Sequence, residues 1–402
     1  MRNKYIYFLL FTAALLYMTI PYFFEKYLFF NELLSFSGFC ILVANRFRIG
    51  NDNISKIVLA LILLGSFHAV ISIFRMDTIY YYLRNSVILY SMFTFFIGYF
   101  GYKYFVPSIK KIRTTLRFYY TIFLLKPAEN VFFDRFSIST SLPLLFKRYR
   151  GFYTVLLVSI FTVIHALDYK SATSFVAALF LLFLYLSPSY NFFRQVVISG
   201  FIIFTLFFIY FFPNFALIHT SDQPIHDWMA INQITSSHYL LGVDENSTWR
   251  LVLWYQYLVD RFPGNLFGYG FGTPVVFHFP ILDIDKLATL PYVIGAHNTF
   301  VTLFCRLGIF FLINIILLYT TVFKEYFYYR RYYEKTYDIF IFYSFFAFFI
   351  LCFFNPALET PLHSGGYWLI LGLLTGSVKK RNENFVALDI KKETEMHLKL
   401  SI

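Results

Sequence analysis

The sequence predicts an all-α, polytopic integral membrane protein with about ten to twelve transmembrane helices and one large, partly helical loop on the outer face. Its 402 residues are 58% hydrophobic and 14% charged, whereas a soluble domain is roughly 25% charged. Mean hydropathy is +0.61. Apolar runs separated by short basic links fill the chain, and only one long polar run, 213–297, interrupts them. This pattern excludes an ordinary soluble domain.

The N-terminal part, 1–212, contains about seven firm spans. Their predicted ranges are 5–24, 28–44, 54–74, 87–106, 152–167, 172–186 and 196–212. The first run follows Arg2 and Lys4 but lacks a small-residue cleavage site, so we interpret it as a transmembrane helix rather than a signal peptide. Pro127 and Pro143 break 118–150 into pieces too short for ordinary crossings. This region is either an interfacial segment or two short shielded helices, and both alternatives return the chain to the side it left.

The polar run 213–297 forms the large loop, and the C-terminal part follows it. Residues 298–378 hold three further predicted spans at 299–323, 340–354 and 366–378, and a charged tail occupies 379–402. A loop of this length is too long for a structureless connection.

The distribution of charge predicts which side each link faces. The net charge is +12, and a cytoplasmic N-terminus would place about 26 of the 34 Lys and Arg in cytoplasmic links, as the positive-inside rule requires. Acidic residues outnumber basic ones in the large loop, which fits translocation. Both termini are therefore expected in the cytoplasm and the loop outside. The basic charge is accounted for in this way, so a nucleic-acid partner is not expected.

The large loop contains three groups of residues suited to binding an anion. Spacing predicts a helix over Thr248–Val259 with Arg250, Trp254 and Tyr257 on one face. Gly268 and Gly270 belong to a flexible turn whose N–H groups can approach a ligand. His297 and Asn298 stand at the first turn of an apolar helix, where the helix dipole favours an anion such as a diphosphate.

Each of these residues also has a simpler structural interpretation. Arg250 can be a solvated helix residue, His297 an interfacial cap, and the glycines plain turn residues. Arg306 lies two turns inside a membrane helix, where a charge must be paired or face a wet cavity, so it either lines the donor site or forms a structural pair. Lys170 and Arg84 are outer-link charges, and Glu359 lies in the last outer link.

The order of these motifs carries a resemblance. Arg250-x-x-x-Trp254, then Phe267-Gly-Tyr-Gly-Phe-Gly272, then His297-Asn298 and 303–308 resemble the signature of the O-antigen ligase and O-antigen polymerase superfamily. The arrangement of helices around a large outer loop is also similar to that family, so the resemblance covers most of the chain. Its specific motifs span Arg250 to Gly308.

The resemblance implies a bacterial inner-membrane glycosyltransferase that moves a glycan en bloc from an undecaprenyl-diphosphate-linked donor. Arg250 would bind the diphosphate, and His297 would be the base for the acceptor hydroxyl. The family's second arginine beside a serine is replaced here by Lys170-Ser171, which keeps the charge but loses the bidentate fork. Glu359 is close to the place of an acidic residue in the ligases. Asn298, Trp254, Arg84, Arg306, Gly268 and Gly270 complete the expected substrate-binding set.

The chemistry of the residues agrees with transfer that needs neither metal nor other cofactor. A neutral histidine with a pKa near about 6.5 is a suitable base, and arginine can stabilise a leaving diphosphate. No Cys, His or carboxylate group shows metal-ligand spacing, and Cys40, Cys305 and Cys352 suggest no disulfide framework.

The partners and alternatives follow from the same resemblance. The acceptor is the next glycan repeat for a polymerase or the lipid A core for a ligase; the divergent motif favours the polymerase slightly. Membrane lipid and a chain-length regulator or flippase of the same pathway are further expected partners. A flippase of lipid-linked sugars is the alternative from another class, although the chain lacks the internal repeat typical of transporters. A purely structural membrane protein would leave the Arg250-to-His297 pattern unexplained.

Overall fold

The computed structural model describes residues 5–7, 9–11, 13, 30–104, 172–206, 250, 253–254, 257–258, 261–273, 276–277, 292–293, 295–333 and 338–400. The expectations for 118–150, for the span 152–167, for Lys170 and for most of the loop 213–297 lie outside these residues.

The described chain is helical apart from one short antiparallel pair, β1 (Val276–Phe277) with β2 (Tyr292–Val293). The helices of the N-terminal part are α3 (Phe30–Ala44), α4 (Asn53–Ile73), α5 (Ile79–Asn85), α6 (Val87–Tyr90), η1 (Ser91–Phe93), α10 (Ala172–Leu186) and α11 (Tyr190–Leu206). Helix continues from η1 through residues 94–104. The later helices are η6 (Gly264–Leu266), α14 (Thr299–Tyr333), α15 (Asp338–Phe354) and α16 (Pro361–Leu400). Within the described residues, the all-α expectation is therefore confirmed except for the short strand pair.

Several predicted spans coincide with helices of the structure. Helix α10 has the predicted bounds, α4 differs by one residue at each end, and α14 begins at the predicted Thr299. Helix α11 begins at Tyr190, earlier than the predicted 196, and α16 continues through the predicted tail to Leu400. Apolar composition therefore located the helices better than it located their ends.

Among the described residues, two helices are long and apolar enough to cross a membrane, Asn53–Ile73 and Thr299–Tyr328. Shorter apolar helices lie at Phe30–Ala44, Tyr190–Leu206 and Ile341–Phe354. Large apolar side chains are exposed along α4, including Leu63 and Phe67, and along α11, including Phe201 and Ile203. Apolar faces of this extent are costly in water and favourable in lipid, which fits membrane association.

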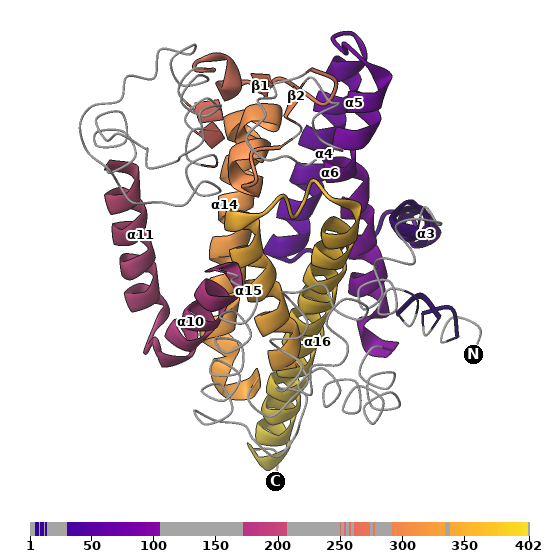
Figure 1. The fold of residues 1–402 in the computed structure, drawn as a ribbon. Coiled ribbons are helices and arrows are strands. Elements are labelled where there is room, and N and C mark those ends of the chain that lie inside the picture. The colour runs from indigo at the N-terminus through magenta and orange to yellow at the C-terminus, as the bar shows by residue number, and fades with distance from the viewer. Residues whose placement is uncertain are drawn as a thin grey trace, which may run out of the picture.

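Helix α3 is oriented differently from the long helices. Figure 1 shows α3 along its axis, whereas α4, α14 and α16 run up and down the same view. Its 15 residues span about 22 Å at 1.5 Å per residue, which is less than the roughly 30 Å hydrocarbon core of a bilayer. The structure thus lays the second predicted span across the bundle rather than alongside it.

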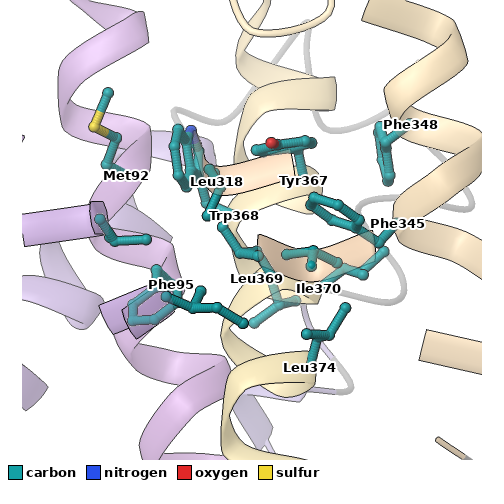
Figure 2. Packing of buried hydrophobic residues seen from close by; sticks show 14 of the residues in the cluster. Met92, Phe95, Leu318, Phe345, Phe348, Tyr367, Trp368, Leu369, Ile370 and Leu374 are labelled. Atoms are coloured by element: carbon teal, nitrogen blue, oxygen red, sulfur yellow. The ribbon is translucent and has the colours of Figure 1, made fainter. Parts of the chain in front are cut away.

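The core is built from aromatic side chains on α14, α15, α16 and the helix 94–104. Trp368, Tyr367 and Phe345 are fully or almost fully buried where these elements meet (Figure 2). The backbones come very close there, because a Cβ on Gly372 would lie 2.0 Å from the carbonyl oxygen of Phe95. Glycine is required at this crossing, and the close contact holds α16, and the link before it, against the bundle.

Helix α14 is kinked at Gly308, whose φ of 75° and ψ of −176° are not helical. The kink leaves carbonyls of the first segment open to other donors. Tyr269 N–H donates to the Cys305 carbonyl and Gly270 N–H to the Arg306 carbonyl, both at 2.8 Å. Helix α4 packs along α14. The glycine run, residues 267–272, and α4 therefore brace the first three turns of α14.

Candidate functional site

The start of α14 gives a fixed position to His297. Asn298 caps the helix, since its Oδ1 accepts from Val301 N–H at 3.1 Å. Ala296 N–H donates to Thr302 Oγ at 3.0 Å, which ties the preceding chain to the next turn. His297 lies between these bonds with φ 49°, in the left-handed region that few non-glycine residues adopt. Asn298 thus has a capping role, in addition to the predicted contact with substrate.

The segment that carries Arg250 lies against this helix start. Arg250, Trp254 and Tyr257 are spaced so that they share one face of a helix. Trp254 Nε1 donates to the Ala296 carbonyl at 2.7 Å, and the Tyr257 carbonyl accepts from Cys305 Sγ at 2.9 Å. Tyr257 itself is fully buried. These bonds hold the face that bears Arg250 beside the chain that bears His297.

Arg250 and His297 lie close enough to influence each other's charge. Burial, together with the nearby Arg250 guanidinium, lowers the pKa of His297 from 6.5 to about 4. The pKa is lowered because the imidazolium would lose its hydration and would stand beside another cation. His297 is therefore neutral at pH 7, but it is a weaker base than the ordinary pKa suggested.

Glu359 reaches the same place from the link between α15 and α16. Its Oε2 accepts from the Thr299 hydroxyl at 2.7 Å. The same hydroxyl accepts from Ala357 N–H at 2.9 Å. The Glu359 side chain is 7% exposed. Burial raises the pKa of its carboxyl, an effect opposed by the hydrogen bond from Thr299 and by the charge of Arg306. The segment that bears Arg250 and the α15–α16 link thus both contact the start of α14.

Arg306 is buried and its guanidinium holds the glycine run. It is 1% exposed, and its Nη1 donates to the carbonyls of Gly270 at 3.2 Å and Thr273 at 3.3 Å. Two roles were predicted for Arg306, and these contacts fit the structural one. They also connect the run to the first segment of α14, which follows His297.

The glycines of the run are explained by close packing. A Cβ on Gly268 would lie 2.5 Å from the Arg306 carbonyl oxygen, and one on Gly270 would lie 2.2 Å from Ser72 Oγ. Ser72 Oγ also accepts from Phe271 N–H at 2.9 Å. The N–H groups of residues 269–271 thus donate to protein oxygens, which gives the run a bracing role. The predicted role of Gly268 and Gly270 in substrate binding is not needed to explain them.

The remaining predicted residues are less closely tied to this site. Arg84 is exposed on α5, and its Nη1 lies 3.4 Å from Tyr80 Oη on the same helix. The charge of Arg84 is the weakest of several that act on Arg306, so Arg84 borders the site rather than forming it. Lys170 lies outside the described residues.

Two contributors were not singled out from the sequence. Thr299 was named only as the start of an apolar helix, yet its hydroxyl joins α14 to Glu359. Tyr257 was assigned to a helix face without a role, yet it is the buried end of the face that carries Arg250. The i, i+4, i+7 spacing was a signal for Tyr257, whereas Thr299 had none, because its partner is distant in sequence.

Among the described residues, no group of three or more His, Cys, Asp and Glu side chains is placed to hold a metal ion. No family model matches the chain, and neither a curated protein nor a solved structure shows significant similarity to it.

Proposed function

We propose that the protein is an integral membrane glycosyltransferase that moves a glycan from an undecaprenyl-diphosphate-linked donor to a sugar hydroxyl, with its active site at the outer face of a bacterial inner membrane. The observation that carries the proposal is that Trp254 Nε1, on the same segment as Arg250, donates to the Ala296 carbonyl just before His297. Arg250 is close enough for its charge to lower the pKa of His297. Both residues belong to the motifs by which the sequence resembles the O-antigen ligase and polymerase superfamily.

The arrangement supports transfer chemistry at a diphosphate. Arg250 is half-buried, so its charge is less screened than at a free surface. An arginine fork can bind phosphate oxygens in a bidentate manner and stabilise them as the leaving group departs. The helix N-terminus adds a partial positive charge at the same place. The acceptor hydroxyl must then lose a proton to a nearby base, for which the resemblance suggests His297.

The first experiment compares Arg250→Ala and His297→Ala in a strain that lacks the native gene. Each change is expected to lower glycan transfer at least about 100-fold, since removal of one stabilising donor or base has effects of this size. The measurement is the surface glycan, separated by length on a gel. Arg194→Ala is the matched control, because Arg194 is an exposed arginine on α11 stacked on Tyr190.

The glycan pattern of the deletion strain separates the two forms of the reaction. A polymerase deletion leaves one repeat unit on lipid A, whereas a ligase deletion leaves polymer on undecaprenyl diphosphate. We favour the polymerase slightly, because the motif is divergent. Full transfer by Arg250→Ala protein at normal level in the membrane would rule out the proposed function.

A further inference from the structure

The carboxyl group of Glu359 is held rigidly at the head of α14. Its Oε2 accepts from the Thr299 hydroxyl at 2.7 Å. That hydroxyl is itself fixed by N–H groups of Ala357 at 2.9 Å and Leu358 at 3.3 Å. The link that carries the carboxyl is thus bonded to the helix that carries His297, and the side chain has little freedom to turn away.

The second carboxyl oxygen, Oε1, points toward the chain just before His297. It is buried and has no hydrogen-bond partner among the described residues. A Cβ built on Gly295 would lie 3.8 Å from it and 3.6 Å from Thr302 Oγ. Leaving a buried carboxyl oxygen without a donor is costly. A buried acceptor oxygen whose lone pairs are free is explained if it takes part in a reaction or binds a ligand.

The charged and titratable groups around this carboxyl come from three elements. Arg306 acts on it from α14, Tyr257 from the loop helix, and Cys352 from α15. Arg306 is a cation, and it favours the ionised carboxylate, while burial disfavours it. Burial has the larger effect, so the pKa of Glu359 is raised above its ordinary 4.5.

The two candidate bases at the head of α14 are therefore shifted in opposite directions. The pKa of His297 is lowered to about 4 by burial and by Arg250, whereas the pKa of Glu359 is raised. A base is most effective when its pKa approaches the working pH. Opposite shifts of neighbouring titratable groups indicate which one is the base.

We propose that Glu359, rather than His297, takes the proton of the acceptor hydroxyl. In this step the acceptor oxygen bonds to the anomeric carbon of the donor sugar, and the bond from that carbon to the diphosphate oxygen breaks. The lipid diphosphate leaves with the electron pair, and the hydroxyl proton passes to Glu359 Oε1. Neutral His297 orients the hydroxyl and Arg250 stabilises the diphosphate. This inference rests on the proposed glycosyltransferase function.

The test is the pH dependence of kcat for the purified full chain, with the undecaprenyl-diphosphate-linked repeat unit isolated from the deletion strain as substrate. Rate rises with pH as the base loses its proton. If Glu359 is the base, the acid limb of wild type lies above pH 4.5, and Glu359→Gln loses about 100-fold to 10,000-fold in kcat. Glu359→Asp keeps a carboxylate, so it retains part of the rate and an acid limb.

The control is Glu325→Gln, which removes a half-buried carboxyl near the other end of α14 and should leave kcat unchanged. Melting temperatures of all variants show that they are folded. The inference is overturned if Glu359→Gln keeps the wild-type rate, or if an acid limb near pH 4 survives in it and disappears in His297→Gln. Either outcome leaves the transferase proposal standing, whereas that proposal fails on its own if Arg250→Ala keeps full transfer.

Discussion

Arg306 shows how a buried charge can serve structure next to a candidate site. Its guanidinium donates to the carbonyls of Gly270 and Thr273, and it is 1% exposed. Arg306→Met removes these donors and leaves buried acceptors, each costing about 1–3 kcal/mol. We expect a clearly lower melting temperature in detergent, with part of the loss remaining in Arg306→Lys, because an ammonium lacks the planar fork.

The same pair of variants separates the two roles predicted for Arg306. A bracing role predicts that stability and transfer fall together. If Arg306→Met melted like wild type but no longer transferred glycan, the side chain would instead contact the donor.

At the level of single residues, the sequence indicates Arg250, Trp254 and His297 through local spacing and motif. In the structure, Trp254 Nε1 donates to the Ala296 carbonyl, next to His297. The sequence could not show that burial lowers the pKa of His297 to about 4, because burial depends on segments distant in the chain. For the same reason it named Glu359 without a partner, although Thr299 binds it directly.

The kink in α14 is the element on which the position of the site depends. Gly308 has φ 75°, and a Cβ there would lie 2.6 Å from the Leu266 carbonyl oxygen. Gly308→Ala must therefore keep a positive φ with ψ of −176°, a conformation essentially confined to glycine that costs about 1–3 kcal/mol. It must also displace the backbone at Leu266 and Phe267. We expect a lower melting temperature and weaker transfer.

Gly200→Ala provides the matched control for this prediction. Gly200 lies within helix α11, and a Cβ there would meet nothing within 4 Å. Alanine in place of glycine in a helix interior is favourable by about 0.5–1 kcal/mol. Equal melting temperatures for the Gly308→Ala and Gly200→Ala proteins would contradict the brace.

Elements were predicted well where apolar runs define them, and poorly where contacts between elements shape them. The start of α14 and the bounds of α10 follow from the sequence. The kink does not follow from the sequence, because the carbonyls that it frees accept from the N–H groups of Tyr269 and Gly270, which are distant in the chain. The crosswise direction of α3 in Figure 1 is likewise set by packing on η1 and α16.

For the whole molecule, the described residues place the candidate site at one end and a group of basic residues at the other. Asp77 N–H donates to the Gly272 carbonyl at 3.2 Å, so the α4–α5 turn and the glycine run share one end. Lys379 and Lys380 lie over the rings of Tyr99 and Tyr102 at centroid distances of 5.2 and 6.0 Å. These basic residues and tyrosines are typical of a cytoplasmic membrane interface. The site should therefore face outward.

Cysteine accessibility tests this orientation directly. Asp77 and Lys380 are both exposed, so Asp77→Cys and Lys380→Cys are suitable positions for a membrane-impermeant maleimide. In cells with a permeable outer membrane and an intact inner membrane, we expect Asp77→Cys to react at once. Lys380→Cys should react only after the inner membrane is opened, and the unsubstituted chain measures the background from Cys40, Cys305 and Cys352. The reverse pattern would place Arg250 and His297 in the cytoplasm, away from lipid-linked glycans at the outer face, and the transferase proposal would fail with it.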